Sequence, residues 1–132
     1  MHELGITEGI IQRAREAAQA AGGIRVTDVY LTITPAADFT VDSIEMYFEM
    51  LTADDDYFRG ARLHWERQTA AASCLECGAA FQAAETRPLC PSCNSRQVRF
   101  DIRAPMLQLV GVDVAEAGDP APEGADGSPP IG

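Results

Sequence analysis

Apolar residues recur every three or four positions in two stretches near the start of the chain. In residues 6–21 this stripe ends at Gly22-Gly23, a pair that favours a stop, so a helix is predicted there. A second stripe in residues 41–52 predicts another helix, with Thr40 as its N-cap. The positions expected to face the core are Ile6, Ile10, Ala14, Ala17 and Ala21, followed by Val41, Ile44, Tyr47, Phe48 and Leu51.

Three other stretches alternate between apolar and polar residues, as half-buried strands do: residues 24–33, 61–72 and 106–114. The apolar faces expected for them are Val29, Leu31 and Ile33, then Leu63 and Trp65, then Val110, Val112 and Val114. The order of helix, strand, helix, strand, cysteine-rich stretch and strand predicts an α+β protein.

The chain of 132 residues has a formal net charge of −10, which disfavours nucleic acid and anionic lipid as main partners. No apolar run is long enough to cross a bilayer, and the N-terminus has no basic region followed by an apolar segment. We therefore expect a cytoplasmic protein in a reducing environment. The run Asp54-Asp55-Asp56 lacks the spacing of an EF-hand and predicts a solvated loop.

The cysteines form two Cys-x2-Cys pairs separated by twelve residues: Cys74, Cys77, Cys90 and Cys93. Two residues between cysteines let one turn direct both sulfurs at a common point. Gly78 and Asn94, directly after the pairs, tolerate the left-handed backbone that such turns need. Four thiolates form a closed tetrahedral shell, which is typical of structural zinc. Two disulfides and a rubredoxin-like iron site are the alternatives, and a reducing compartment favours the metal.

The cysteine-rich stretch divides the chain into a main domain and an inserted module. The expected division is residues 1–72 plus 104–116 for the main α/β domain, residues 73–103 for the zinc domain and residues 117–132 for a tail. Phe81 and Leu89 are the expected minimal core of the zinc domain. The tail is rich in Pro, Gly and acidic residues, so it is expected to be disordered.

A second donor set lies at the N-terminus, where the α-amine of Met1, the amide and imidazole of His2 and the amide of Glu3 are close in sequence. A planar set of nitrogens suits Ni(II) or Cu(II) better than Zn(II), and the alternative is a solvated or capping histidine. The other histidine, His64, is expected on the polar face of its strand, with a surface role. It becomes an auxiliary ligand only if the fold places it beside His2. No nucleophile and base are paired in the sequence, so an enzyme is not expected.

These features together resemble the HypA/HybF family of hydrogenase nickel-incorporation proteins, from Met1 to about Glu116. The marks are Met1-His2-Glu3-Leu4, the segment 25–29 (RVTDV), Phe48-Glu49 and the pattern Cys-x2-Cys-Gly…Cys-Pro-x-Cys. The resemblance implies a nickel domain with a three-stranded sheet and two helices, a separate zinc domain, and Ni(II) held through His2 and Glu3. The chain departs from the family pattern at Gly5, at Thr34-Pro35 and near Thr40, where some relatives carry an acidic residue.

The resemblance also implies a nickel metallochaperone that serves the large-subunit precursor of a nickel-iron hydrogenase, with the GTPase HypB as partner. Some relatives serve urease as well. The alternatives are a zinc-ribbon module that binds nucleic acid or a protein machine, and a redox protein that holds iron. One residue added before Met1 should abolish nickel binding by a chaperone and leave a zinc-ribbon module unaffected.

Overall fold

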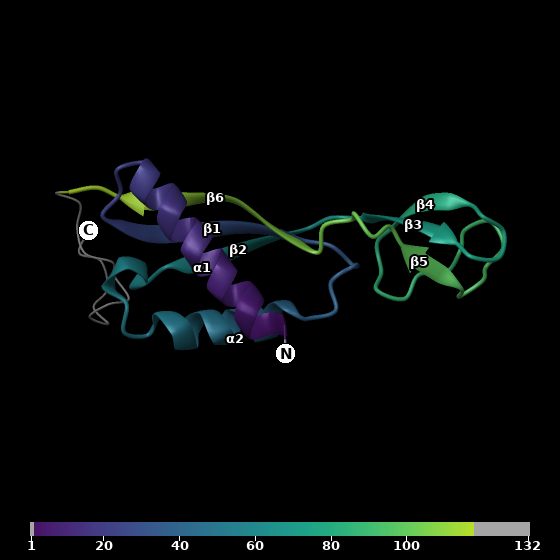
Figure 1. Ribbon diagram of the computed structural model, residues 1–132, viewed down its shortest axis with the longest axis horizontal. Coiled ribbons are helices and arrows are strands. Elements are labelled where there is room, and N and C mark those ends of the chain that lie inside the picture. The colour runs from purple at the N-terminus through teal and green to yellow at the C-terminus, as the bar shows by residue number, and fades with distance from the viewer. Residues whose placement is uncertain (1, 118–132) are drawn as a thin grey trace, which may run out of the picture. The chain divides into compact units, whose positions relative to one another are not determined.

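The computed structural model describes residues 2–117, and Figure 1 shows how the helices and strands of this part of the chain are arranged. In chain order, the elements are α1 (His2–Ala20), β1 (Arg25–Ile33), α2 (Val41–Thr52), the 3₁₀ turn η1 (Asp56–Phe58), β2 (Arg62–Arg67), β3 (Ala70–Cys74), β4 (Ala80–Ala83), β5 (Val98–Phe100) and β6 (Leu107–Ala115). The strands form two three-stranded sheets with the orders β2-β1-β6 and β4-β3-β5. The predicted α+β class is confirmed. Residues 118–132 of the expected tail lie outside the described residues.

The described chain groups into two compact units. The helical unit comprises residues 2–31, 39–64 and 109–117, with α1, α2 and most of the sheet β2-β1-β6. The cysteine unit comprises Thr32–Asp38 and Trp65–Gln108, with the sheet β4-β3-β5. Neither of the helices within residues 2–117 combines the length and apolar character that a bilayer-spanning helix needs.

One face of α1 packs into the core of the helical unit. Its fully buried positions are Thr7, Ile10, Ala14 and Ala18, spaced by three or four residues. The prediction was wrong for Ala17 and Ala21, which are exposed. The helix turns by 100° per residue, so Ala18, four residues after Ala14, stays on the buried face while Ala17 turns away from it. The helix also begins at His2, four residues earlier than predicted.

The second helix has the predicted bounds and the predicted cap. The hydroxyl of Thr40 accepts a hydrogen bond from the Ser43 N–H at 3.1 Å, which satisfies one of the unpaired donors of the first turn. Ile44 and Phe48 are buried, as their spacing predicts. The ring of Phe48 meets the edge of the buried Phe58 ring with 5.9 Å between centroids, so the turn after α2 also contributes to the core.

The run Asp54-Asp55-Asp56 was predicted to be a solvated loop, and this prediction was wrong for one of the three aspartates. Asp54 and Asp56 are exposed, but Asp55 caps η1 by accepting from the Tyr57 N–H at 3.0 Å. Asp55 also accepts from the Arg15 guanidinium at 2.5 Å, and this hydrogen bond lowers the pKa of the carboxyl below its ordinary value of 3.8. Asp55 therefore ties α1 to the end of α2. The sequence run alone could not separate it from its neighbours.

Strands β1, β2 and β6 follow the predicted alternation except at Thr32, which is buried although it was expected on the polar face, and at Val110. Val29 and Leu31 of β1 are buried, as expected. In β6, Val112 and Val114 are half-buried but Val110 is 66% exposed, so the prediction that the three valines share an apolar face was wrong for Val110. The alternation of burial shifts by one residue at Gly111, where two consecutive residues are half-buried.

A glycine between α1 and β1 allows the close approach of β6. A Cβ atom placed on Gly23 would lie 2.5 Å from the Cβ of Val114, whereas a Cβ on Gly5 in α1 meets nothing within 4 Å. We expect Gly23→Ala to destabilise the helical unit by about 1–3 kcal/mol, because either the backbone at residue 23 or strand β6 must move to relieve the clash with Val114. Gly5→Ala is the matched control and should stabilise by about 0.5–1 kcal/mol, since alanine favours helix. Urea unfolding of both variants measures the difference, and equal stabilities would contradict the steric explanation.

The sheet of the cysteine unit shows that the predicted strand over residues 61–72 is in fact two strands. β2 ends at Arg67 and β3 begins at Ala70. The Gln68 N–H between them donates to the Ile33 carbonyl at 2.9 Å. β3 then pairs antiparallel with both β4 and β5, with Ser73 opposite Ala80 and Arg99. The alternation in the sequence in fact stops after Trp65, where four polar residues (66–69) are followed by three alanines (70–72), and the prediction of one strand missed this signal.

The interior of this second sheet is built from small side chains. Its buried residues are Ala70, Ala72, Cys74, Ala83 and Cys90. Phe81 is half-buried, but Leu89 is 42% exposed, so the prediction that Leu89 forms the core was wrong. Three alanines and two cysteines bury too little apolar surface to hold a module of this size together without another source of stability.

Candidate metal centre

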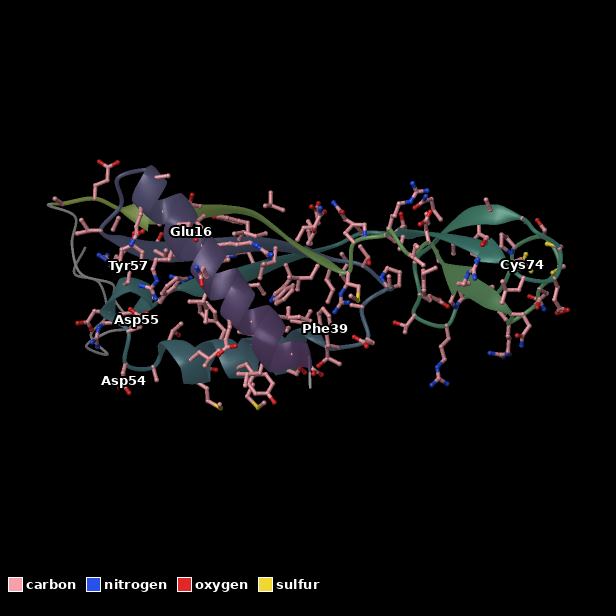
Figure 2. The ribbon with its side chains drawn as sticks, viewed as in Figure 1. Glu16, Phe39, Asp54, Asp55, Tyr57 and Cys74 are labelled. Carbon is pink, nitrogen blue, oxygen red and sulfur yellow. The ribbon has the colours of Figure 1, made fainter. Side chains whose placement is uncertain are left out.

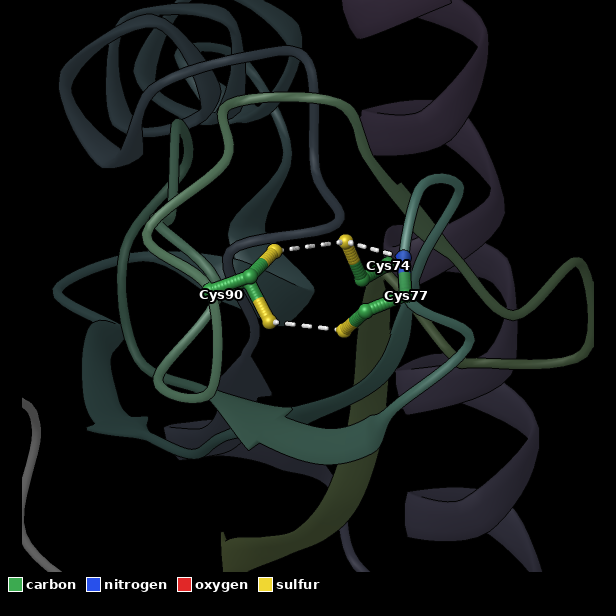
Figure 3. Close-up of side chains that lie close together, drawn as sticks. Cys74, Cys77 and Cys90 are labelled. Carbon is green, nitrogen blue, oxygen red and sulfur yellow. Dashed lines mark hydrogen bonds between the residues drawn. The ribbon is translucent and has the colours of Figure 1, made fainter.

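The structure brings the four cysteine sulfurs to one point of the cysteine unit (Figure 3). All four Sγ atoms lie within 4.8 Å of one another. The Cys74–Cys93 and Cys77–Cys90 sulfurs are each 3.6 Å apart, well beyond the length of about 2.05 Å of a disulfide bond. Cys74 and Cys90 are buried, and Cys77 and Cys93 are exposed. The arrangement is that of a metal site.

Two equivalent turns hold these sulfurs in place. In the first, the Gly78 N–H donates to the Cys74 carbonyl at 3.0 Å, and in the second the Asn94 N–H donates to the Cys90 carbonyl at 2.8 Å. Gly78 has a φ of 77° and Asn94 a φ of 64°, the left-handed backbone that was predicted for both. The residue after each cysteine pair therefore closes its turn.

Backbone N–H groups inside the turns point at the first sulfur of each pair. The N–H groups of Cys77 and Glu76 both lie 3.4 Å from the Cys74 sulfur and lower the pKa of its thiol to about 6. In the second turn, the N–H groups of Cys93 and Ser92 lower the pKa of the Cys90 thiol in the same way. These donors stabilise the thiolate form, which is the form that binds a metal.

The exposed cysteines behave in the opposite way. The N–H of Ser95 lowers the pKa of Cys93, but the neighbouring thiols, that of Cys74 above all, outweigh it and raise the pKa to about 12. The pKa of Cys77 is also raised: the Ala79 N–H lowers it, and the thiol of Cys90 acts against this. Four sulfurs this close cannot all be charged without a cation among them.

The sulfur spacing fits a tetrahedral zinc ion. Zinc–sulfur bonds of about 2.3 Å in a tetrahedron place the sulfurs about 3.8 Å apart. The measured separations of 3.6 Å, with all sulfurs inside 4.8 Å, are close to this geometry. Among the side chains that the structure describes, which do not include that of His2, no other group of three or more His, Cys, Asp or Glu converges in this way.

The predicted N-terminal donors lie at the start of α1. Met1 and the side chain of His2 are outside the described residues, so the structure places only the backbone of His2 and the residue Glu3. The amides of a helix's first turn have no acceptor within the helix, so those of His2 and Glu3 have no acceptor within α1. The hydroxyl of the buried Thr7 donates to the Glu3 carbonyl at 2.6 Å, which anchors this first turn.

His64 lies on the polar face of β2, as predicted, and its neighbours hold it there. Its ring stacks on Tyr30 with 4.8 Å between centroids, and its Nε2 is 2.7 Å from a carboxylate oxygen of Asp28. Partial burial raises the pKa of Asp28, but the hydrogen bonds with His64 and Thr27 hold it below its ordinary value. Tyr30 in turn donates to Asp113 of β6 at 2.6 Å. The sequence did not predict this network, because the alternation of apolar and polar residues within a strand does not reveal which strands pair with one another.

Fold and site together define a small α+β protein with a four-cysteine metal centre on a sheet of its own. A comparison with family models matches residues 1–106 to "Hydrogenase/urease nickel incorporation, metallochaperone, hypA". The chain belongs to this HypA family. The family predicted from the motifs is confirmed.

Individual relatives agree with this assignment. The hydrogenase maturation factor HypA of Geotalea uraniireducens is 39% identical over 94 residues, covering 71% of this chain and 82% of the relative. HypA of Azotobacter vinelandii is 35% identical over 99 residues, covering 75% of this chain and 87% of the relative. The solution structure of the Ni metallochaperone HypA from Helicobacter pylori superposes with a TM-score of 0.62 over 88% of this chain and 99% of that one. At 17% identity, this last comparison supports the fold alone.

Proposed function

We propose that this protein is a nickel metallochaperone that binds Ni(II) at its N-terminus and delivers it during maturation of a nickel-iron hydrogenase. The observation that carries the proposal is the family match over residues 1–106, which includes both the Met-His-Glu start and the cysteine pairs. The proposed nickel donors are the α-amine of Met1, the amide and imidazole of His2, and Glu3. The protein carries its metal to another site and catalyses no reaction.

The four cysteines have a different proposed role, which is to hold a structural zinc ion. A closed shell of four sulfurs has no open position for water or substrate, so the metal stabilises the fold. The proposed division of labour therefore separates the domain that carries nickel, residues 1–72 plus 104–116, from the zinc domain, residues 73–103.

Release of nickel follows from ligand exchange. Nitrogen donors at a chain end hold Ni(II) in a site that can open, and thiolates of a hydrogenase precursor compete for it. The amine, amide and imidazole donors must lose protons to bind, so nickel affinity falls in mild acid. We propose a HypB-type GTPase and the hydrogenase large-subunit precursor as partners in the cytoplasm. Urease maturation, which the family name includes, is the proposed second destination of the nickel.

The alternative of a nucleic-acid-binding zinc ribbon finds little support in the charges. Within Thr32–Asp38 and Trp65–Gln108, five arginines are matched by five acidic residues. A unit without net positive charge lacks the attraction to phosphate that such binding requires.

Isothermal titration with Ni(II) tests the proposed nickel site. The untagged, zinc-loaded protein should bind nickel, and His2→Ala should weaken binding by roughly 100-fold or more because it removes a direct ligand. His64→Ala is the matched control, since His64 is the chain's other histidine and is paired with Asp28. Its affinity should stay unchanged. Equal nickel affinities for the parent and His2→Ala would refute the proposed site.

A further inference from the structure

A groove runs beside α1, next to the face of the helix that packs into the core. Its α1 wall is built from residues at helical spacing, from Glu8 through Ile11 and Arg15 to Gln19. The facing wall is formed by Leu51 of α2 and by Asp55. The groove has a volume of about 520 Å³, enough for several side chains of a partner.

The floor of this groove is apolar although it faces solvent. Ile11 and Leu51 are each half-buried, while the rim residues Glu8, Glu16 and Gln19 are exposed. An apolar floor inside a polar rim has the composition of a surface that receives an apolar anchor from another molecule.

The rim carries negative charge that the groove itself does not neutralise. Its cation, Arg15, is paired with Asp55 at 2.5 Å and lies over the ring of Phe58, with 5.0 Å from Cζ to the centroid. Glu8 and Glu16 form no ion pair among residues 2–117, and Glu16 accepts only a hydrogen bond of 3.3 Å from Gln12. Two carboxylates therefore remain available to a cationic partner.

The surroundings strengthen this charge. α1, α2 and residues 53–59 contain nine acidic residues against three arginines, and the chain has no lysine. Figure 2 shows Glu16 on α1 and, within the same unit, Asp54 and Asp55 in the turn that follows α2. Such a field attracts positively charged segments and repels acidic ones.

We propose that the groove binds a basic amphipathic helix of a partner protein. Glu8 and Glu16 are eight positions apart on α1, which is about 12 Å along the helix axis, and Ile11 lies between them. The matching partner is a helix that carries two Lys or Arg residues eight positions apart and an apolar residue midway between them. Its two cations correspond to Glu8 and Glu16, and its apolar residue corresponds to Ile11. The apolar residue enters between Ile11 and Leu51, and the two cations reach Glu8 and Glu16. This surface is independent of the proposed nickel site.

The test uses the full-length protein and a fluorescein-labelled, alanine-based helical peptide of roughly 16 residues, with one leucine flanked four residues away on each side by an arginine. Fluorescence anisotropy should show binding that weakens as salt is added. Glu16→Arg should weaken binding about tenfold. Glu85→Arg makes the same charge change at an exposed residue outside the groove and should leave the affinity unchanged. Amide shifts on peptide addition should centre on Ile11, Gln12 and Leu51.

Four results would overturn the proposal. Glu16→Arg could bind as tightly as the parent, a peptide of the same composition in shuffled order could bind equally well, or the shifts could lie elsewhere. Self-association of the free protein that Glu16→Arg removes would assign the groove to a second copy of the chain and would also overturn it. Nickel titration of Glu16→Arg should match the parent, so failure of this proposal is distinguishable from failure of the nickel proposal.

Discussion

Replacing Cys90 with serine is expected to remove zinc and unfold the sheet β4-β3-β5. The buried residues between positions 70 and 100 are three alanines and two cysteines, so apolar burial contributes little. Binding of structural zinc contributes about 10–16 kcal/mol in small modules, which is comparable to the whole free energy of unfolding of a typical domain. Loss of a buried ligand should therefore leave this sheet without its main source of stability.

Metal analysis and amide NMR check this expectation. Cys90→Ser should retain far less than one zinc per chain, and the dispersed signals of residues 70–100 should collapse to the unfolded range. Ser92→Ala is the matched control, because it keeps the backbone N–H that points at the Cys90 sulfur. It should keep its zinc. A Cys90→Ser protein with full zinc and a dispersed spectrum would contradict the assigned role of the cluster.

The pH dependence of the same site has a defined sign. The pKa of the Cys74 thiol is lowered from 9.0 to about 6, so its thiolate is retained until the pH falls through about 6. The stability that this group contributes is therefore full above about pH 9, declines as the pH falls, and is lost below about pH 6. Cys93, with its pKa raised to about 12, must instead give up its proton when zinc binds. Zinc binding near pH 7 should release protons, and zinc affinity should fall as the pH is lowered, more steeply below about pH 6, where the Cys74 thiol must also lose a proton to bind.

Acetylating the N-terminus is expected to abolish nickel binding. The chain contains no lysine, so the α-amine of Met1 is its only primary amine and an amine-specific reagent modifies this position alone. An acetylated nitrogen is a poor donor for Ni(II), so affinity should fall by roughly 100-fold or more, as on loss of any direct ligand. A variant with one glycine before Met1 should show a similar loss because the amine moves out of register.

Unfolding cannot explain such a loss. Acetylation removes a positive charge from the positive end of α1, which begins at His2, and so should keep or raise its helicity in circular dichroism. Zinc content should be unchanged. Acetylation of His2→Ala should cause little further loss, since both changes remove the same chelate. Unchanged nickel affinity after complete acetylation, verified by mass spectrometry, would exclude the α-amine as a ligand.

Local patterns in the sequence determined much of the fold. The spacing in residues 41–52 and the Thr40 cap predicted α2 correctly, because capping and helical periodicity act within a few residues. The Cys-x2-Cys pairs with Gly78 and Asn94 predicted two left-handed turn ends, which the structure confirms. The family was also recognisable from motifs alone, and the match over residues 1–106 confirmed it.

Tertiary structure decided what depends on residues far apart in the chain. Three aspartates in a row look alike in sequence, and only the packing of α1 against the turn after α2 selects Asp55 as the partner of Arg15. The change of sheet between β2 and β3 and the stacking of His64 on Tyr30 arise from pairing between strands that are distant in the sequence. The cysteine pattern thus predicted the sulfur cluster by itself, because each turn is local. The groove beside α1 needed the fold, since its two walls come from helices that only tertiary packing brings together.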